Sequence, residues 1–222
     1  MEIDWFPLWL SLRVAVLSTL MAVACGMALA YVLANGRFRG REALDAALTL
    51  PLVLPPTVLG YYLLVVLGRE SALGRLYESI FGGPLVFSWQ AAVVAAFLHS
   101  APLLIKYIRA ALESVDHSYE RAARTLGAGE WRLFWRVTMP LAQRSILAAT
   151  ALAFARSLGD FGVTIMVAGN IPGRTQTIAV AIYDAVEAGN GALARLLVII
   201  ISAIALTILW LANRYGPRQT PA

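Results

Sequence analysis

The sequence predicts an all-α integral membrane protein with about five transmembrane helices, and three observations support this fold class. Of the 222 residues, 59% are hydrophobic and only 14% are charged, whereas soluble domains carry about a quarter charged residues. The mean hydropathy is +0.71. The apolar residues also gather into runs of the roughly 20 residues that a helix needs to cross a bilayer. A soluble domain of this length has too little interior to bury so much apolar surface, so we expect lipid to cover it.

Five apolar runs are the predicted spans, and together they make the whole chain, residues 1–222, a single transmembrane domain. The spans cover residues 7–34, 46–67, 87–112, 140–168 and 193–213. The first and third are rich in alanine and other small residues, which let helix backbones approach closely in lipid. The second contains three prolines, and the fourth is broken by Arg156 and Asp160.

The stretch from Thr175 to Val186 is a weaker candidate for a span. It is moderately apolar but short, and it carries Asp184 near its end, with Glu187 directly after it. We therefore expect an interfacial or re-entrant segment here, with a sixth span as the alternative.

The basic residues predict the orientation, because loops rich in Lys and Arg stay in the cytoplasm. Twelve of the 18 basic residues fall after the first span, around the loop at 113–139 and in the C-terminal tail. This places the N-terminus outside and the C-terminus in the cytoplasm, as five spans require. The net charge of +5 is thus explained by membrane orientation, and we expect no nucleic-acid partner because no water-soluble domain carries the basic residues.

Composition argues against several kinds of site. A single cysteine, Cys25, allows no intrachain disulfide and no cysteine-based metal site, and two histidines are too few for a metal cluster. The sequence contains no Gly-x-x-x-x-Gly-Lys-Ser/Thr phosphate loop. We therefore expect no metal, no bound cofactor and no ATP hydrolysis on this chain.

The longest predicted cytoplasmic connection, residues 113–139, has the pattern of a short surface helix. Ser118 is a suitable N-cap, Glu120 favours the positive end of a helix, and Gly127 is a natural C-terminal stop. Pro140 follows near the start of the fourth span, where proline is tolerated. Physics alone leaves two interpretations open: a solvated connection, or a helix that seats in a groove on another protein.

Polar groups and helix breakers within the spans are the candidates for a translocation path or gate. The prolines at Pro55 and Pro56 free backbone carbonyls, as in the broken helices that line transport paths; a structural kink is the alternative. Arg156 and Asp160 are spaced i, i+4 and can pair, and ionisable groups at membrane depth usually face a bundle interior or a pathway. Arg156 would attract an oxyanion, but too many fixed charges would trap the ion, so the sequence favours a paired, structural or gate-setting role. The remaining candidates, which can hydrate an ion or bond a neighbouring helix, are Ser157 and Thr164.

The 113–139 connection resembles the EAA loop of ABC importer permeases. The matching positions are Ala122, Ala123, Gly127, Val137, Met139 and Pro140. The family's glutamate would fall at Arg121, whereas this chain has Glu120 one place earlier. Segments 50–60, 122–129 and 154–177 further resemble the molybdate permeases, and the likeness extends over nearly the whole chain. The sulfate permeases share this architecture.

The resemblance implies a type I ABC importer permease fold in a bacterial inner membrane, with molybdate as substrate and sulfate, thiosulfate or tungstate as alternatives. The loop would then be a coupling helix that docks on a cytoplasmic ATPase. The residues implied in ATPase coupling are Glu120, Arg121, Ala122, Ala123, Leu126, Gly127 and Pro140. The implied partners are a second copy of this chain, ATP-binding subunits that use ATP and Mg, and an external molybdate-binding protein.

The sequence fits two other classes of function less well. A membrane-embedded enzyme needs acids or histidines clustered near one membrane face, and the acidic residues here are scattered. An autonomous channel or carrier needs ion-coupling or selectivity groups within the spans, where only Arg156 and Asp160 qualify. Such a protein would also leave the pattern in residues 113–139 unexplained.

Overall fold

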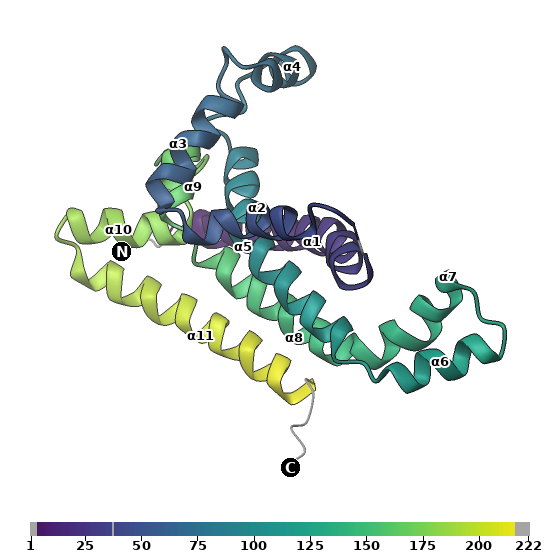
Figure 1. Cartoon of the computed structure of the whole chain (residues 1–222). Helices are drawn as coiled ribbons and strands as arrows, with labels where there is room; N and C mark the ends of the chain where they lie inside the picture. Colours follow the sequence, from purple (N-terminus) through teal and green to yellow (C-terminus); the bar gives the residue numbers. More distant parts are fainter. Residues whose placement is uncertain (1–3, 37, 216–222) are drawn as a thin grey trace.

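The computed structural model describes residues 4–36 and 38–215, and these residues form an elongated bundle of helices without any strand (Figure 1). The elements in chain order are α1 (Phe6–Asn35), α2 (Arg41–Val53), α3 (Pro56–Leu67), α4 (Ala72–Phe81), α5 (Trp89–Glu113), α6 (His117–Thr125), α7 (Glu130–Leu133), the π-helical turn η1 (Phe134–Thr138), α8 (Met139–Leu158), α9 (Gly162–Ala168), α10 (Ile178–Glu187) and α11 (Gly191–Tyr215). Four helical stretches are long and apolar enough to cross a membrane, or five if the bent pair α2–α3 counts as one span. The predicted all-α membrane fold is therefore confirmed.

Small residues bring α1, α5 and α8 together at the centre of the bundle. Ala22, Gly26 and Ala30 follow one another at intervals of four along α1, and all three are buried. A methyl group added at Gly26 would lie 3.3 Å from Cγ1 of Ile105 on α5, so the two backbones approach too closely for a larger residue. Only part of the small-residue pattern serves this contact, since Ala24, for example, is exposed.

The second predicted span, 46–67, is not one helix but two, α2 and α3, which meet at an angle of 111°. The break lies at Leu54 and Pro55, whose backbones are extended, with ψ near 138° and 139°. Proline at 56 then starts α3, because its missing N–H has no partner at a helix start in any case. The prolines thus produce a reversal of direction that is much sharper than a kink.

The fourth predicted span, 140–168, also differs from expectation at both ends. The helix begins earlier, because α7, η1 and α8 form one stretch from Glu130 to Leu158. It ends earlier too, and residues 159–161 separate it from the short helix α9. The five residues of η1 are π-helical, a local widening of the helix that often marks functional positions.

The two breaks lie against each other, because α3 packs against α9. A methyl group added at Gly162, the first residue of α9, would lie 2.6 Å from Cβ of Pro56, the first residue of α3. Further along, a methyl at Gly60 would lie 2.6 Å from Cβ of Met166. Glycine at both positions permits this contact, and the buried Leu59, Leu63 and Val163 fill the space around it.

The segment predicted as interfacial or re-entrant, Thr175 to Val186, contains α10. This helix has ten residues, about 15 Å of length at 1.5 Å per residue, which is half of what a bilayer core requires. It is nevertheless anchored in the bundle: the backbone N–H of Ile178 donates to the buried Oγ of Ser11 at 2.8 Å. The structure therefore favours the shorter segment over a sixth span.

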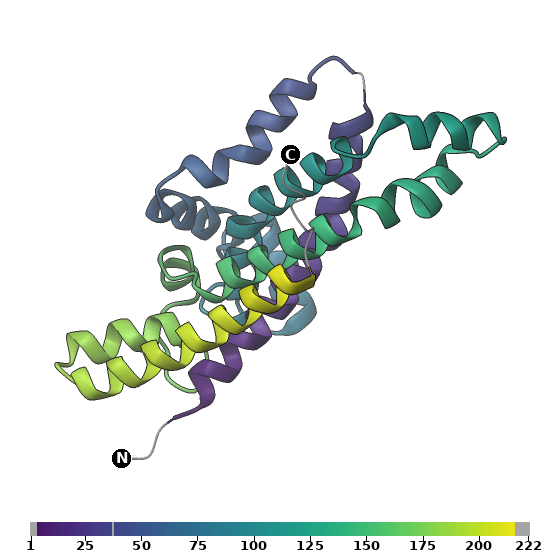
Figure 2. The ribbon, with the colours of Figure 1, turned by 90° about the horizontal axis from the view of Figure 1, so that it is seen from below.

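One end of the bundle carries a projecting arm. Figures 1 and 2 both show α6 and α7 extending beyond the ends of the neighbouring helices, with η1 joining α7 to α8. Figure 2 also shows that the start of α1 and the turn between α10 and α11 lie at the opposite end. We call residues 116–138 the arm.

Candidate functional site

The arm's first helix, α6, is capped by Asp116 and not by Ser118. The Oδ1 atom of Asp116 accepts a hydrogen bond from the backbone N–H of Ser118 at 2.8 Å. This bond favours the charged carboxylate and lowers the pKa of Asp116 below its ordinary value. Both residues are good cap formers, and the prediction placed the helix start two residues too late.

The predicted stop at Gly127 is present, and its backbone geometry explains why the helix ends there. Gly127 has a φ of +79°, in the left-handed region that glycine adopts without strain. The N–H of Ala128 bonds to the carbonyl of Ala123 at 3.1 Å, and the N–H of Gly127 bonds to that of Arg124 at 3.0 Å. These two bonds form a Schellman motif, which satisfies the last carbonyls of α6.

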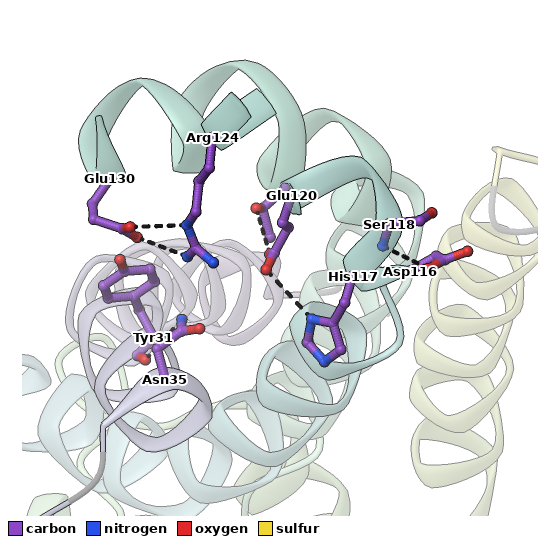
Figure 3. A network of polar contacts seen from close by, with 9 residues as sticks. Tyr31, Asn35, Asp116, His117, Ser118, Glu120, Arg124 and Glu130 are labelled. Carbon is purple, nitrogen blue, oxygen red and sulfur yellow. Dashed lines mark hydrogen bonds and ion pairs between the residues drawn. The ribbon is translucent and has the colours of Figure 1, made fainter. Parts of the chain in front are cut away.

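Two side-chain contacts join α6 to the helix that returns to the bundle (Figure 3). Glu120 accepts a hydrogen bond from the hydroxyl of Thr138 in η1 at 3.1 Å. Arg124 donates to both carboxylate oxygens of Glu130, at 3.1 and 3.2 Å, and this partner raises the pKa of Arg124. Glu120, which lies one place before the position of the family's glutamate, therefore makes a contact within the arm. Arg121, which occupies that position, is exposed.

The base of the arm is fixed against α1 by aromatic rings. The ring of Phe134 in η1 meets that of Tyr31 edge-on, with centroids 4.8 Å apart. Trp135 then packs edge-on against Phe134. These contacts, together with the Glu120–Thr138 bond, tie the π-helical turn to two neighbouring elements.

The tip of the arm presents apolar and small side chains to its surroundings. The exposed fraction is 88% for Leu126, 77% for Trp131 and 57% for Tyr119. Ala122 is exposed, and Ala123 is half-buried. Large apolar residues that are exposed together mark a surface that contacts another protein or a membrane. Pro140, by contrast, lies behind the arm as the second residue of α8.

A second polar feature lies inside the bundle, around the break between α8 and α9. We call His99, Arg156, Asp160 and Thr164 the polar cluster. Nδ1 of His99 lies 2.6 Å from Oδ1 of Asp160, and Nε2 of His99 lies 2.6 Å from Nη2 of Arg156. The hydroxyl of Thr164 donates to Oδ2 of Asp160 at 2.5 Å. Asp160 and Thr164 are buried, whereas Arg156 is exposed.

The expected pairing of Arg156 with Asp160 is therefore wrong in its detail. Spacing of i, i+4 brings side chains together only along a continuous helix, and α8 ends at Leu158, before Asp160. Within the described part of the chain, no ion pair of 4.0 Å or less joins these two residues; His99 lies between them instead. Sequence reasoning missed His99, which lies on α5.

The donor and acceptor chemistry of its two partners assigns the tautomer of His99. A guanidinium has N–H donors only, so Nε2 of His99 must accept the hydrogen bond from Arg156. Nδ1 then carries the single ring proton and donates it to Asp160. The cluster is therefore an arginine cation, a neutral imidazole and a carboxylate in series.

The depth of the cluster follows from the position of His99 along its helix. His99 is the eleventh residue of the 25-residue α5, about 15 Å from its first residue and about 21 Å from its last. α5 is long and apolar enough to cross a hydrocarbon core of about 30 Å, and in such a span the cluster would lie away from both membrane faces. Ionisable groups at that depth are costly and face a protein interior or a pathway.

The other predicted path residues lie around the same break. Pro55 and Pro56 are exposed, and Pro56 contacts Gly162 as described above. Ser157 is buried, with only 4% of its surface exposed, and its hydroxyl has no hydrogen-bond partner among the described residues. No group of three or more His, Cys, Asp or Glu side chains suited to a metal ion occurs in residues 4–36 and 38–215.

Comparison with known proteins adds a family and close relatives. A family described as "Binding-protein-dependent transport system inner membrane component" matches residues 22–221. The molybdenum transport system permease protein ModB of Escherichia coli (strain K12) is 46% identical over 215 residues, covering 95% of this chain and 94% of the relative. ModB of Haemophilus influenzae is 42% identical, covering 92% of each chain. A probable sulfate transport system permease protein of Chlorokybus atmophyticus is 34% identical, covering 91% of this chain and 71% of the relative.

Solved structures agree on the fold. A bacterial ABC transporter that imports the acidic polysaccharide alginate superposes with a TM-score of 0.75 at 18% identity, covering 99% of this chain and 82% of the other. The MetNI methionine ABC transporter, in an inward-facing conformation, superposes with a TM-score of 0.75 at 16% identity, covering 94% and 92%. At such low identity these matches show the fold alone, which is the type I ABC importer permease fold predicted from the sequence.

Proposed function

This chain belongs to the family of binding-protein-dependent transport system inner membrane components, and on that premise we propose that it is the permease subunit of an ATP-driven importer for molybdate. The observation that carries the proposal is its 46% identity to a molybdenum permease over 95% of the chain. The match to the sulfate permease is weaker, at 34%, and leaves more of that relative uncovered. Membership in a permease family also means that the chain itself is not a catalytic subunit.

We propose that the arm is the element through which a cytoplasmic ATPase acts on the bundle. Its tip offers an apolar contact surface at Tyr119 and Leu126, and α6 is stiffened at both ends by Asp116 and Gly127. The proposed coupling residues are those predicted from the sequence, with Glu120 holding α6 against η1 through Thr138. A displacement of α6 by the partner is thereby passed directly to α8.

The assembly that we propose contains two copies of this chain around a central path, two ATP-binding subunits and an external molybdate-binding protein. ATP and Mg belong to the ATP-binding subunits in this proposal, and the permease binds no cofactor. Binding and hydrolysis of ATP would then stabilise alternately inward-facing and outward-facing states, which is a shift between two conformations and not the opening of a fixed pore.

Uptake of labelled molybdate by vesicles that contain the reconstituted complex tests the proposed substrate. We expect uptake that requires ATP and the binding protein and that a hundredfold excess of sulfate reduces only slightly. Sulfate competition as strong as competition by unlabelled molybdate would reassign the chain to sulfate. Uptake by the chain alone without ATP would contradict an importer subunit and would instead support a channel or carrier.

Cysteine labelling tests the proposed orientation of the arm. In a Cys25→Ser background, Leu126→Cys places a thiol at the exposed tip of the arm, and Ser79→Cys places one on α4, which is predicted to lie outside. A membrane-impermeant maleimide should label position 79 in intact cells and position 126 only in inverted vesicles. Bound ATPase should protect position 126. Labelling of position 126 in intact cells would remove the basis for the coupling proposal.

A further inference from the structure

The polar cluster contains an arrangement that a simple ion pair would not need. We propose that His99 is a positioning residue that holds Arg156 apart from Asp160, and so keeps the guanidinium available to a doubly charged tetrahedral oxyanion in the translocation path. This inference rests on the proposed function, because it concerns how the same path takes its substrate.

Both carboxylate oxygens of Asp160 already accept hydrogen bonds. One oxygen accepts the Nδ1 proton of His99 at 2.6 Å, and the other accepts the hydroxyl proton of Thr164 at 2.5 Å. The Asp160 side chain is only 2% exposed. The carboxylate is therefore fixed and hydrogen-bonded without help from Arg156, and an approaching anion cannot contact it directly.

Most N–H donors of the Arg156 guanidinium have no partner among the described residues. A guanidinium has five N–H donors in a planar fork that matches the oxygens of an oxyanion. Within the described residues, one hydrogen bond occupies the group, the bond to Nε2 of His99. Arg156 is exposed, so its guanidinium is accessible from outside this chain. A direct pair with Asp160 would instead occupy two donors and cancel the positive charge.

The imidazole of His99 links the cation to the anion. As a neutral ring, His99 accepts from the cation at one nitrogen and donates to the anion at the other, so it adds no charge of its own. It orients the guanidinium but leaves its charge intact. A single oriented cation away from both membrane faces attracts an anion without the multiple fixed charges that would prevent release.

Transport kinetics with variants of His99 test this role in the assembled complex. His99→Leu removes both hydrogen bonds and lets Arg156 reach Asp160; we expect the KM for molybdate to rise about tenfold or more, with Vmax changed less than twofold. His99→Gln keeps one donor and one acceptor, and we expect its KM to stay within about threefold of the parent. Arg195→Gln on α11, an exposed arginine without a side-chain hydrogen bond or ion pair to the described residues, is the matched control and should leave KM unchanged.

Rescue distinguishes this role from a structural one. If His99 serves to keep the guanidinium from Asp160, then the double variant His99→Leu/Asp160→Asn, in which the competing charge is removed, should recover most of the lost affinity. A double variant as weak as His99→Leu, or a His99→Leu variant that loses only Vmax, would overturn the inference. Should His99→Leu fail to assemble, His99→Ala takes its place with the same expected KM and the same rescue.

The outcomes also separate this inference from the proposed function. Lack of ATP-dependent molybdate uptake by the parent complex would refute the proposed substrate. If the parent complex transports sulfate instead, the same KM series is measured with sulfate, which is also a tetrahedral dianion. Normal uptake by the parent with no KM change in the His99 variants would refute the positioning role alone.

Discussion

The contact between the two helix breaks makes Gly162 a position where a single added methyl group should be damaging. In Gly162→Ala the new Cβ would lie 2.6 Å from Cβ of Pro56 and 3.4 Å from its Cγ. Carbon atoms in contact prefer 3.5–4.0 Å, so α3 and α9 must separate by about 1 Å. The proline ring cannot turn aside, because it is closed onto its own backbone. Overpacking of this kind costs about 1–3 kcal/mol.

Thermal unfolding of the purified complex in detergent and vesicle uptake measure this effect. For a chain of this length, about 1–3 kcal/mol corresponds to a fall in Tm of about 2–12 °C. Gly159→Ala is the matched control, because it lies in the same connection, its added methyl would lie 3.7 Å from the carbonyl of Ala155, and its φ is −94°. We expect the control to retain the parent Tm and uptake rate, and Gly162→Ala to lose both.

A compensating change shows whether the clash with Pro56 is the cause. Pro56→Gly removes the atoms that the new methyl would meet, so the double variant Gly162→Ala/Pro56→Gly should be more stable than the sum of the single effects predicts, by about 1 kcal/mol or more. Equal losses in Gly162→Ala and Gly159→Ala, or strictly additive effects in the double variant, would refute the reasoning that the breaks lie in direct contact.

Three further predictions concern the arm. Gly127→Ala forces a side chain into a φ of +79° although no atom lies within 4 Å, so the strain of about 1–2 kcal/mol should loosen the end of α6 and lower the amount of ATPase that co-purifies. Leu126→Asp should reduce that co-purification more strongly without changing the Tm of the isolated permease, because this side chain is 88% exposed. The lowered pKa of Asp116 means that its cap stabilises α6 at neutral pH and is lost as pH falls below about 4. The protection of the α6 amides against hydrogen exchange, relative to the intrinsic exchange rate at each pH, should fall there, and less so in Asp116→Asn.

Hydropathy predicted the long helices well because it measures the property that lipid selects. The predicted spans 7–34, 87–112 and 193–213 end within about two residues of α1, α5 and α11. The other two spans also lie in helical regions, but their courses depend on tertiary contact. Proline at 55 and 56 predicts that a helix breaks, whereas the bend of 111° is set by the packing of α3 on α9, which no local rule contains.

The polar cluster was predicted in part, and its missing member explains why. Arg156, Asp160 and Thr164 are close in sequence and were all predicted as path or gate candidates, but His99 is separated from Arg156 by 57 positions and from Asp160 by 61. A lone histidine in an apolar run gives no signal of its partners. The predicted pairing of Arg156 with Asp160 was wrong for a related reason. It required one continuous helix through both residues, whereas α8 ends at Leu158.

The arm and the polar cluster lie at the two ends of one helical element, which gives a direct mechanical connection between them. The helix from Glu130 to Leu158 has 29 residues, about 43 Å of length, and it is bonded to α6 near its start and to His99 through Arg156 near its end. The hydrogen bond between Arg156 and His99 is 2.6 Å long, and it would be lost if the two residues moved apart by 1 Å or more. Displacement of α6 must therefore either disturb the contact at Arg156 or be absorbed where the helical ladder is irregular, at η1. Since η1 is held by Thr138 and Phe134 against α6 and α1, we expect the first outcome: access of the oxyanion to Arg156 changes with the position of the arm.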